Sequence, residues 1–502
     1  MEEIKEKLGE VKSHLRNLSY LTQAEGLISW DMQTYIPEKA IESRIEVLGY
    51  LFSQILDMVT SPKIGQWLEY FSDKMEELSF QDRKMIENLK EEYDEFIKIP
   101  QEKNKEFEML CSTSEAFWKK AKENNDYEGF KKYLSRIVEF TREFAGYVGY
   151  EGNIYNYALN RFEKGLTVEA LDKIFTELRD GIVELLGKIK KSQVSIDDNC
   201  FKVFFSKQEQ DDFGKFVLNK IGYDFKAGRL DTTVHPFTTE FGNKDVRITT
   251  NYDEYDFRSA FFSNIHEGGH GIYGQNIGDE LQYTGLADGS SMGIHESQSR
   301  YYENILGRSR SFWIYFYPEL QKRFPQFKDI TLENFYKGIN KVEPSLIRTE
   351  ADELTYSLHI IIRYELERAL LNGEINVDEL PLKWKEKYRE YLGVEPENPS
   401  EGVLQDTHWS SGMIGYFPSY ALGNLYGAQF LNKMKMDIPN YEEEVEKGNF
   451  HIIKEWLRVN IHQYGKLYSP EELIKRVTGE ELNPKYFLEY LNVKYSEIYE
   501  LA

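Results

Sequence analysis

One short stretch constrains the fold of this chain more than any other: His266-Glu267-Gly268-Gly269-His270. In an α-helix, histidines four residues apart lie about one turn apart on the same face. Both imidazoles could therefore bind one metal ion, and Glu267 could reach a water on that ion. The stretch predicts a metal-binding helix, and a helix with incidental histidines stays open as the alternative.

The flanking residues favour a helix at this place. Asp253 and Asp256 are of the residue types that cap helix N-termini, and Phe257, Phe261 and Ile265 recur at helical spacing. The two central glycines of the motif cost about 1 kcal/mol each relative to Ala in a helix. We therefore expect them where bare backbone approaches a metal or a substrate.

A third ligand follows a short distance downstream. Glu296 lies in His295-Glu296-Ser297-Gln298, on a second predicted helix that begins after the turn-like Asp288-Gly289-Ser290-Ser291. The connection is long enough for this helix to fold back beside the first. Two His and one Glu leave a tetrahedral zinc one open position for water, which is the catalytic arrangement. The predicted metal ligands are thus His266, His270 and Glu296.

The charge and the cysteines narrow the choice of partners and compartment. The formal net charge is −23, with no basic run, which argues against nucleic acid and anionic membranes as partners. Only Cys111 and Cys200 occur, and the charged N-terminus has no apolar signal core. No stretch of 18 or more apolar residues appears. We expect a cytoplasmic protein that does not enter a membrane.

Two other regions stand out from the amphipathic helices that the rest of the chain predicts. Residues 229–251 are rich in strand formers around a turn at Phe241–Lys244, which predicts a short β-hairpin or small sheet before the metal helix. An edge strand there could hold an extended peptide by main-chain hydrogen bonds. Residues 402–430 are rich in Gly and Tyr, which predicts a loop where backbone approaches something closely.

Several motifs occur in the order found in one known family. They are His235-Pro236-Phe237, Asp245-Val246-Arg247-Ile248-Thr249, His266 to His270, His295-Glu296-Ser297-Gln298 and Ile347-Arg348-Thr349-Glu350-Ala351-Asp352. Trp30-Asp31-Met32-Gln33-Thr34 and Gln405-Asp406-Thr407-His408-Trp409 are also similar to that family. From about residue 16 to its C-terminus, the chain resembles the thermostable metallocarboxypeptidases of the Taq carboxypeptidase type.

The resemblance implies a mainly α-helical, two-lobed protein with a deep central groove and a small antiparallel β-sheet beside the metal site. It implies one catalytic domain over residues 1–502, with a helical N-terminal part to about 190 and a metal-site part from about 191. Family members remove single amino acids from peptide C-termini with broad specificity. They use Zn²⁺, for which Co²⁺ can substitute, and usually form homodimers. His266, His270 and Glu296 fall on the family's ligand positions, and Glu267 falls on its catalytic glutamate.

The mechanism needs a base and donors to the oxyanion of the tetrahedral intermediate. Glu267 would take a proton from the attacking water and pass it to the leaving amine. His408 and Tyr420 are the candidate oxyanion donors, because a similar His and Tyr pair serves related HExxH peptidases. The alternative is a packed tyrosine and a capping histidine.

Recognition of a terminal carboxylate favours arginine, whose planar fork binds it bidentately. The resemblance favours Arg348 for this role, with Arg247 as a second candidate that could instead pair with Asp245. For Arg348 the alternative is a salt bridge to Glu350 or Asp352. His235 is either structural or a substrate contact.

Two other functions remain open at this point. An oligopeptidase that cuts peptides internally would share the same metal ligands, and it differs in lacking a carboxylate clamp. A helical scaffold with a structural metal is the non-enzymatic alternative. Structural zinc sites are usually closed by four protein ligands and rich in Cys, and both cysteines of this chain lie far from the motif in sequence.

Overall fold

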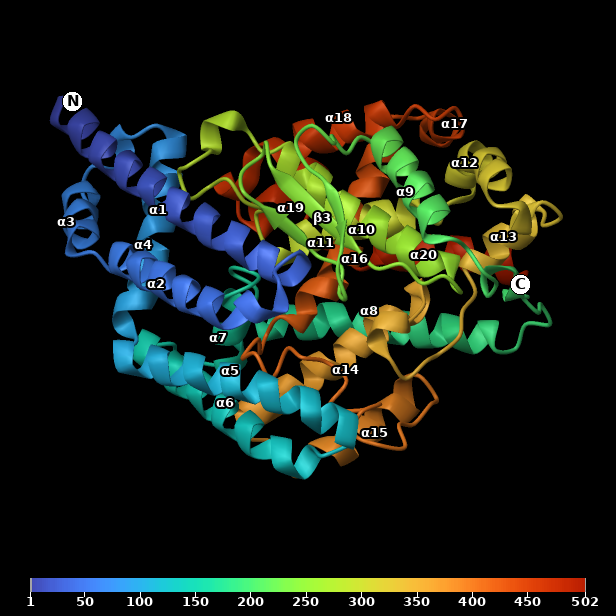
Figure 1. The fold of residues 1–502 in the computed structure, drawn as a ribbon, viewed down its shortest axis with the longest axis horizontal. Coiled ribbons are helices and arrows are strands. Elements are labelled where there is room, and N and C mark those ends of the chain that lie inside the picture. The colour runs from blue at the N-terminus through green and yellow to red at the C-terminus, as the bar shows by residue number, and fades with distance from the viewer. Residues whose placement is uncertain (1, 502) are drawn as a thin grey trace.

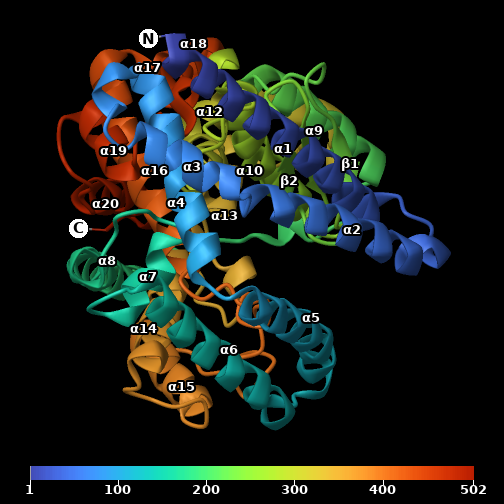
Figure 2. The same ribbon diagram turned by 90° about the vertical axis from the view of Figure 1, so that its left-hand side faces the viewer.

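The computed structural model describes residues 2–501 and shows two helical lobes (Figures 1 and 2). One lobe contains α5 (Gln101–Asn124), α6 (Tyr127–Val148), α7 (Ile154–Asn160), α8 (Val168–Ile189), α14 (Glu353–Asn372) and α15 (Leu380–Tyr391). The other contains α1 (Glu2–Thr34), α2 (Ile41–Val59), α3 (Pro62–Phe71), α4 (Phe80–Lys98), α9 (Lys207–Ile221), α10 (Phe257–Gln275), α11 (Met292–Arg300), α12 (Arg310–Arg323), α13 (Leu332–Ile339), α16 (Phe417–Asp437), α17 (Tyr441–Glu446), α18 (Phe450–Asn460), α19 (Pro470–Thr478) and α20 (Lys485–Tyr499).

Helix α8 illustrates how the sequence builds these lobes. Thr167 caps its N-terminus by accepting a hydrogen bond from the Ala170 amide. Its buried residues recur every three or four positions, among them Leu171, Leu178 and Ile182. Such a stripe buries about 1.5–3 kcal/mol per large apolar side chain against neighbouring helices. The neighbours are α14 and α20, so helices from both sides of residue 190 pack together.

The small sheet has three strands in the order β1-β3-β2. The predicted hairpin is present: β2 (Thr238–Glu240) runs antiparallel to β3 (Val246–Thr250). The prediction of an antiparallel sheet is wrong for β1 (Leu230–Thr232), which runs parallel to β3. The chain reverses once between β1 and β2 and once again at the hairpin turn, so β1 and β3 must point the same way. The sheet is therefore mixed, and β2 lies at one of its edges.

The sheet lies beside α10 in the centre of the molecule (Figure 1). Val246 and Ile248 of β3 are fully buried, which anchors the sheet in the same core as the helices. Among residues 2–501, no helix is long and apolar enough to cross a membrane. Cys111 and Cys200 are both free thiols.

Candidate active site

Helix α10 carries the motif and begins where the sequence predicts. Asp256 is its N-cap and accepts a hydrogen bond from the Arg258 amide. Phe257, Phe261 and Ile265 are buried, as their spacing indicated. The helix continues through Gly271 to Gln275.

The glycines of the motif do not place bare backbone against a metal. A Cβ on Gly268 would lie 2.3 Å from Leu218 Cδ2 of α9, and one on Gly269 would lie 2.7 Å from the backbone of Ser299 in α11. Gly269 therefore needs to be glycine because the backbone of α11 lies too close for a side chain, whereas a side chain at Gly268 would have to displace Leu218. The absence of a side chain at Gly269 permits the close approach of α10 and α11.

Helix α11 presents Glu296 from the side facing α10. Ser291 caps this helix by accepting a hydrogen bond from the Ile294 amide, as the preceding turn predicted. On the other side, a Cβ on Gly423 of α16 would lie 2.6 Å from Glu296 Cγ. Glu296 is thus held between two helices and is 5% exposed.

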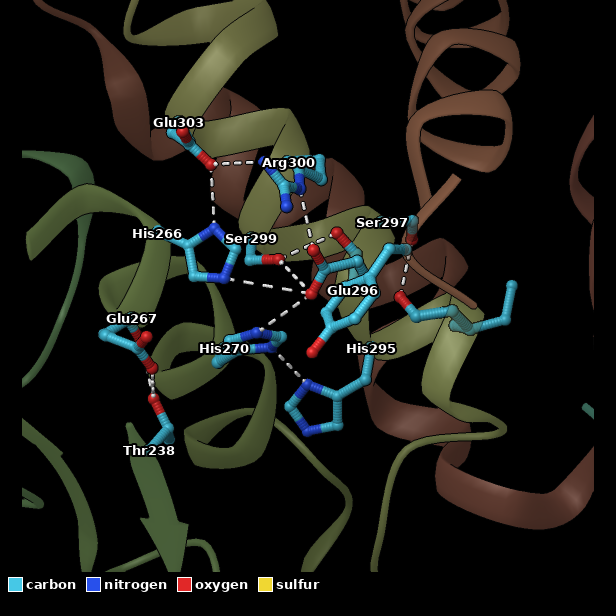
Figure 3. Close-up of polar contacts among 12 residues, drawn as sticks. Thr238, His266, Glu267, His270, His295, Glu296, Ser297, Ser299, Arg300 and Glu303 are labelled. Atoms are coloured by element: carbon cyan, nitrogen blue, oxygen red, sulfur yellow. Dashed lines mark hydrogen bonds and ion pairs between the residues drawn. The ribbon is translucent and has the colours of Figure 1, made fainter. Parts of the chain in front are cut away.

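The three predicted metal ligands converge (Figure 3). Glu296 Oε2 lies 3.8 Å from His266 Nε2 and 3.4 Å from His270 Nε2. One donor atom from each residue lies within 4.8 Å of the other two. Two imidazole nitrogens and one carboxylate oxygen in this arrangement fit a catalytic divalent metal site.

Two residues that were not predicted from the sequence, Glu303 and Arg300, support His266. Its Nδ1 atom lies 2.8 Å from Glu303 Oε2, so Nε2 is left for the metal. Arg300 links the two carboxylates, donating from Nε to Glu296 at 2.7 Å and from Nη1 to Glu303 at 3.2 Å. Glu303 lies in a π-helical turn, Tyr301–Leu306, that directly follows α11. The sequence signal was available, because Arg300 and Glu303 follow Glu296 on the same helical face.

His270 has a different partner. Its Nδ1 lies 2.6 Å from Nδ1 of His295, and Nε2 of His295 lies 2.9 Å from Glu240 Oε1. Glu240 comes from β2, and nothing in its local sequence indicated a role at the metal site.

The two histidine ligands differ in basicity as a result. Burial opposes the charge on His266, but the carboxylates of Glu296 and Glu303 raise its pKa to about 9. Burial lowers the pKa of His270 to about 4. Burial also opposes ionisation of Glu296, yet Arg300 and the two histidines hold its pKa well below its usual range. The site thus offers an ionised carboxylate and one histidine that is neutral at pH 7.

Glu267 of α10 lines the same cavity as the ligands, and its carboxylate lies beside Thr238 (Figure 3). Thr238 of β2 donates a hydrogen bond of 2.6 Å from Oγ1 to Glu267 Oε2. Burial raises the pKa of Glu267. A carboxylate with a raised pKa beside a metal site is suited to accept and return a proton.

The ligands and Glu267 border a cavity of about 920 Å³. Leu15 and Leu18 of α1 also line it, as do Lys466 and the β2 residues Thr238 and Glu240. Four further polar side chains contribute from other parts of the chain: Arg348, Tyr356, Tyr416 and Tyr420. The cavity therefore brings a metal site and an arginine together, as a carboxypeptidase requires.

Arg348 forms neither of the salt bridges considered from the sequence. Its Nε donates to Asp406 at 2.8 Å and its Nη1 donates to the Tyr356 hydroxyl at 2.9 Å. Arg363 binds the other oxygen of Asp406 at 2.7 Å through Nε. Among residues 2–501, Nη2 of Arg348 has no hydrogen-bond partner.

His408 and Tyr420 lie together, with His408 Nε2 and the Tyr420 hydroxyl 3.0 Å apart. Tyr420 lines the cavity, whereas His408 lies behind it and does not. The predicted loop over 402–430 is wrong in its second half, because α16 begins at Phe417 and includes Tyr420. The glycines lower helix propensity there, but they allow close packing: Gly423 lies against Glu296 and Gly427 lies against Ser297.

Arg247 and His235 lie apart from the cavity lining. Arg247 makes two hydrogen bonds of 2.8 Å to Asp245, and its guanidinium lies 4.7 Å from the centre of the Trp30 ring. His235 is exposed, in the bend between β1 and β2.

Comparison with known proteins gives matches over almost the whole chain. A model of the carboxypeptidase Taq (M32) metallopeptidase family matches residues 10–495. Carboxypeptidase 1 of Bacillus subtilis (strain 168) is 45% identical over 488 residues, which cover 97% of this chain and 97% of that protein. Thermostable carboxypeptidase 1 of Thermus thermophilus is 39% identical over 500 residues, covering 96% of this chain and 97% of that protein. The crystal structure of an M32 carboxypeptidase from Deinococcus radiodurans R1 aligns with a TM-score of 0.96 at 35% identity, over 99% of this chain and 100% of that one.

Proposed function

We infer that this chain, which belongs to the carboxypeptidase Taq (M32) metallopeptidase family and is a metallocarboxypeptidase, uses zinc to remove single amino acids from peptide C-termini with broad specificity. The observation that carries the proposal is one cavity bordered by His266, His270, Glu296, Glu267 and Arg348. The resemblance noted from the motifs supports zinc, cobalt as a substitute, and the breadth of specificity.

His266 and His270, through Nε2, and Glu296, through Oε2, would hold the metal. When bound, the ion supplies a Lewis acid that polarises the scissile carbonyl and acidifies water. Glu303 and His295 hold the two imidazole rings from behind. This support keeps the donor atoms directed at one point without help from substrate.

Glu267 is the proposed general base and acid. It accepts a proton from the attacking water and returns it to the leaving amine. The Thr238 hydroxyl holds one carboxylate oxygen, which leaves the other available to accept the proton. Burial keeps its pKa above the usual range, which favours the return of the proton.

Tyr420 is the proposed donor to the developing oxyanion, and His408 is a positioning residue for it. Burial and the nearby Arg348 lower the pKa of His408 to about 3, so the ring is neutral. If His408 carries its proton on Nε2, it donates to the Tyr420 oxygen at 3.0 Å. The Tyr420 hydrogen is then free for the substrate.

Arg348 is the proposed clamp for the substrate's terminal carboxylate. Asp406 and Tyr356 fix its guanidinium from two directions. Arg348 lines the cavity, and its Nη2 atom, which has no hydrogen-bond partner among residues 2–501, can bind a carboxylate oxygen. We propose no substrate contact for Arg247, because its Nε and Nη2 atoms already donate hydrogen bonds to the Asp245 carboxylate.

The experiment is digestion of a defined peptide by the zinc-loaded protein, with products read by mass spectrometry. We expect a ladder that loses one residue at a time from the C-terminus, and no cleavage once that terminus is amidated. Equal cleavage of free and amidated peptides would favour the internally cutting oligopeptidase. A protein that binds zinc without cutting any peptide would favour the non-enzymatic scaffold.

We also propose that the chain forms a homodimer through the outer face of α2. This helix contains no buried residue, although Ile41, Ile45 and Phe52 recur on one face at helical spacing. Ile45 is 56% exposed and Phe52 is 52% exposed. Exposed apolar side chains aligned on one helix face can form an interaction site. Replacing Ile45 and Phe52 by Asp should halve the mass measured by light scattering, and an unchanged dimer would exclude this face.

A further inference from the structure

We propose that His295 and Glu240 form a positioning relay that fixes the metal-binding tautomer of His270. The inference rests on the proposed metal site and deepens it. Strand β2 would then support two functional groups. Glu240 holds the metal ligand His270 through His295, and Thr238 holds the general base Glu267. In this proposal His295, Glu240 and Thr238 bind neither the metal nor the substrate, so they are positioning residues.

The proton positions follow from the hydrogen-bond chain. Only one hydrogen fits between Nδ1 of His270 and Nδ1 of His295, which lie 2.6 Å apart. If neutral His295 donated it, the hydrogen of His270 would sit on Nε2 and block the metal. If His270 donates it, Nε2 of His270 keeps its lone pair, 3.4 Å from Glu296 Oε2.

When a metal is bound, Nε2 of His270 must keep its lone pair, and Glu240 supports the second arrangement. A carboxylate can only accept, so the hydrogen of neutral His295 must lie on Nε2, 2.9 Å from Glu240 Oε1. His295 Nδ1 is then an acceptor, and His270 must donate to it. In the metal-bound protein the carboxylate thus supports the metal-binding tautomer of His270 through the intervening His295 ring.

Glycines on both sides leave room for this relay. A Cβ on Gly274 of α10 would lie 2.5 Å from the Glu240 carboxylate, and one on Gly289 would lie 2.7 Å from Cδ2 of His295. Gly274 therefore has a role at the site, although it lies a full turn beyond His270.

The residues that support the two histidine ligands come from different parts of the fold. Glu303, which supports His266, belongs to the same helical segment as the ligand Glu296. Glu240 belongs to the edge strand β2, whose residues line the substrate cavity. Thr238, two positions earlier on the same face of β2, holds Glu267. A displacement of β2 would therefore disturb both the base and one ligand.

The relay also decides between one and two metal ions per chain. Glu240, Asp288 and His295 have donor atoms within 4.8 Å of one another. In the relay, however, Nε2 of His295 carries a hydrogen and Asp288 is paired with Lys466 Nζ at 2.9 Å. A metal on His295 would reverse the tautomers and remove the lone pair of His270. The relay thus predicts a single tightly bound ion.

The test is zinc affinity, measured by competition with a chromogenic chelator, for Glu240→Gln against wild type. An amide can accept or donate, so both tautomers become available, and we expect zinc to bind about 10–100-fold more weakly. The absorption spectrum of the cobalt-substituted protein should shift as the position of the His270 ring changes. The exposed Glu280→Gln is the matched control and should change neither quantity.

A second variant separates the relay from damage to the fold. Gly274→Ala should leave the midpoint of chemical unfolding unchanged or raised, because Ala favours a helix, yet it should weaken zinc binding by pushing Glu240 aside. Unchanged zinc affinity in both variants would overturn the relay, as would two tightly bound ions per wild-type chain. Wild-type protein that binds no zinc and shortens no peptide would instead overturn the proposed function itself.

Discussion

The cavity has two walls of different character. The metal wall is His266, His270, Glu296 and Glu267, from α10 and α11. The clamp wall is Arg348 and Tyr420, from the chain after residue 347, with Asp406 and His408 supporting them from behind. The proposed function requires proton transfer by groups on the metal wall, whereas the groups on the clamp wall keep one charge state at neutral pH.

The difference lies in the charges around each wall. On the metal wall, Glu296 and Glu303 raise the pKa of His266 to about 9, against the effect of burial. On the clamp wall, burial opposes ionisation of Asp406, but Arg348 and Arg363 hold its pKa well below the usual range. We therefore expect the metal wall to respond to pH and to metal, while Arg348 and Asp406 on the clamp wall stay charged at neutral pH.

The largest effect should come from the metal wall. Glu267→Gln keeps the shape of the base but cannot accept a proton, so we expect kcat to fall about 10⁴-fold. Zinc content, measured by atomic absorption, should be unchanged, since Glu267 is not a proposed ligand. Substantial activity in this variant would remove Glu267 as the base.

The clamp wall should respond in stability as well as in activity. Asp406→Asn leaves the guanidinium groups of Arg348 and Arg363 buried without a carboxylate, which costs about 3–5 kcal/mol. We expect the free energy of unfolding in urea to fall by that amount. Asp378→Asn is the control, because its exposed pair with Lys131 contributes about 0–1 kcal/mol. Equal losses in the two variants would show that Asp406 has no special structural role.

The two walls also differ in how far sequence predicts them. His266 and His270 lie on one helix, so helical periodicity predicts that they share a face, and the short connection to the next helix allows Glu296 to reach them. Arg300 and Glu303 were accessible by the same reasoning and were missed. The pairing of Arg348 with Asp406 and the reach of Glu240 to His295 depend on tertiary packing, which no local pattern encodes.

The fold shows the same limit. Helices and the hairpin followed from periodicity and turn residues. The parallel pairing of β1 and the helical course of α16 did not, since each depends on a distant partner. Gly423 lies in a helix because Glu296 packs against it, and the glycine count alone indicated a loop.

Tyr420 tests whether the clamp wall also stabilises the transition state. Tyr420→Phe removes the proposed donor while keeping the ring, so we expect kcat to fall about 10²–10³-fold with a smaller change in KM. Tyr255→Phe, at an exposed position, is the control. A change confined to KM would assign Tyr420 to substrate binding instead.

The smallest effect, and the one that compares the walls most directly, is their response to pH. In the metal-free protein His266 has a raised pKa of about 9, so an incoming metal must displace its proton below that pH. The apparent zinc affinity should then rise about tenfold per pH unit from 7 toward 9, whereas KM for an N-acylated peptide should stay nearly constant, because Arg348 and Asp406 do not titrate there.

The stability of the metal-free protein should change with pH in the opposite direction to the zinc affinity. A histidine whose pKa is raised by folding stabilises the fold fully below its unfolded value near 6.5, and this contribution is lost as pH rises through about 9. Chelator-treated protein should therefore lose stability over this range, measured by urea unfolding. Glu303→Gln removes one of the carboxylates that raise the pKa, so both transitions should move to lower pH. Zinc affinity that does not depend on pH between 7 and 9 would show that His266 is already neutral, and the contrast between the two walls would then have to rest on packing alone.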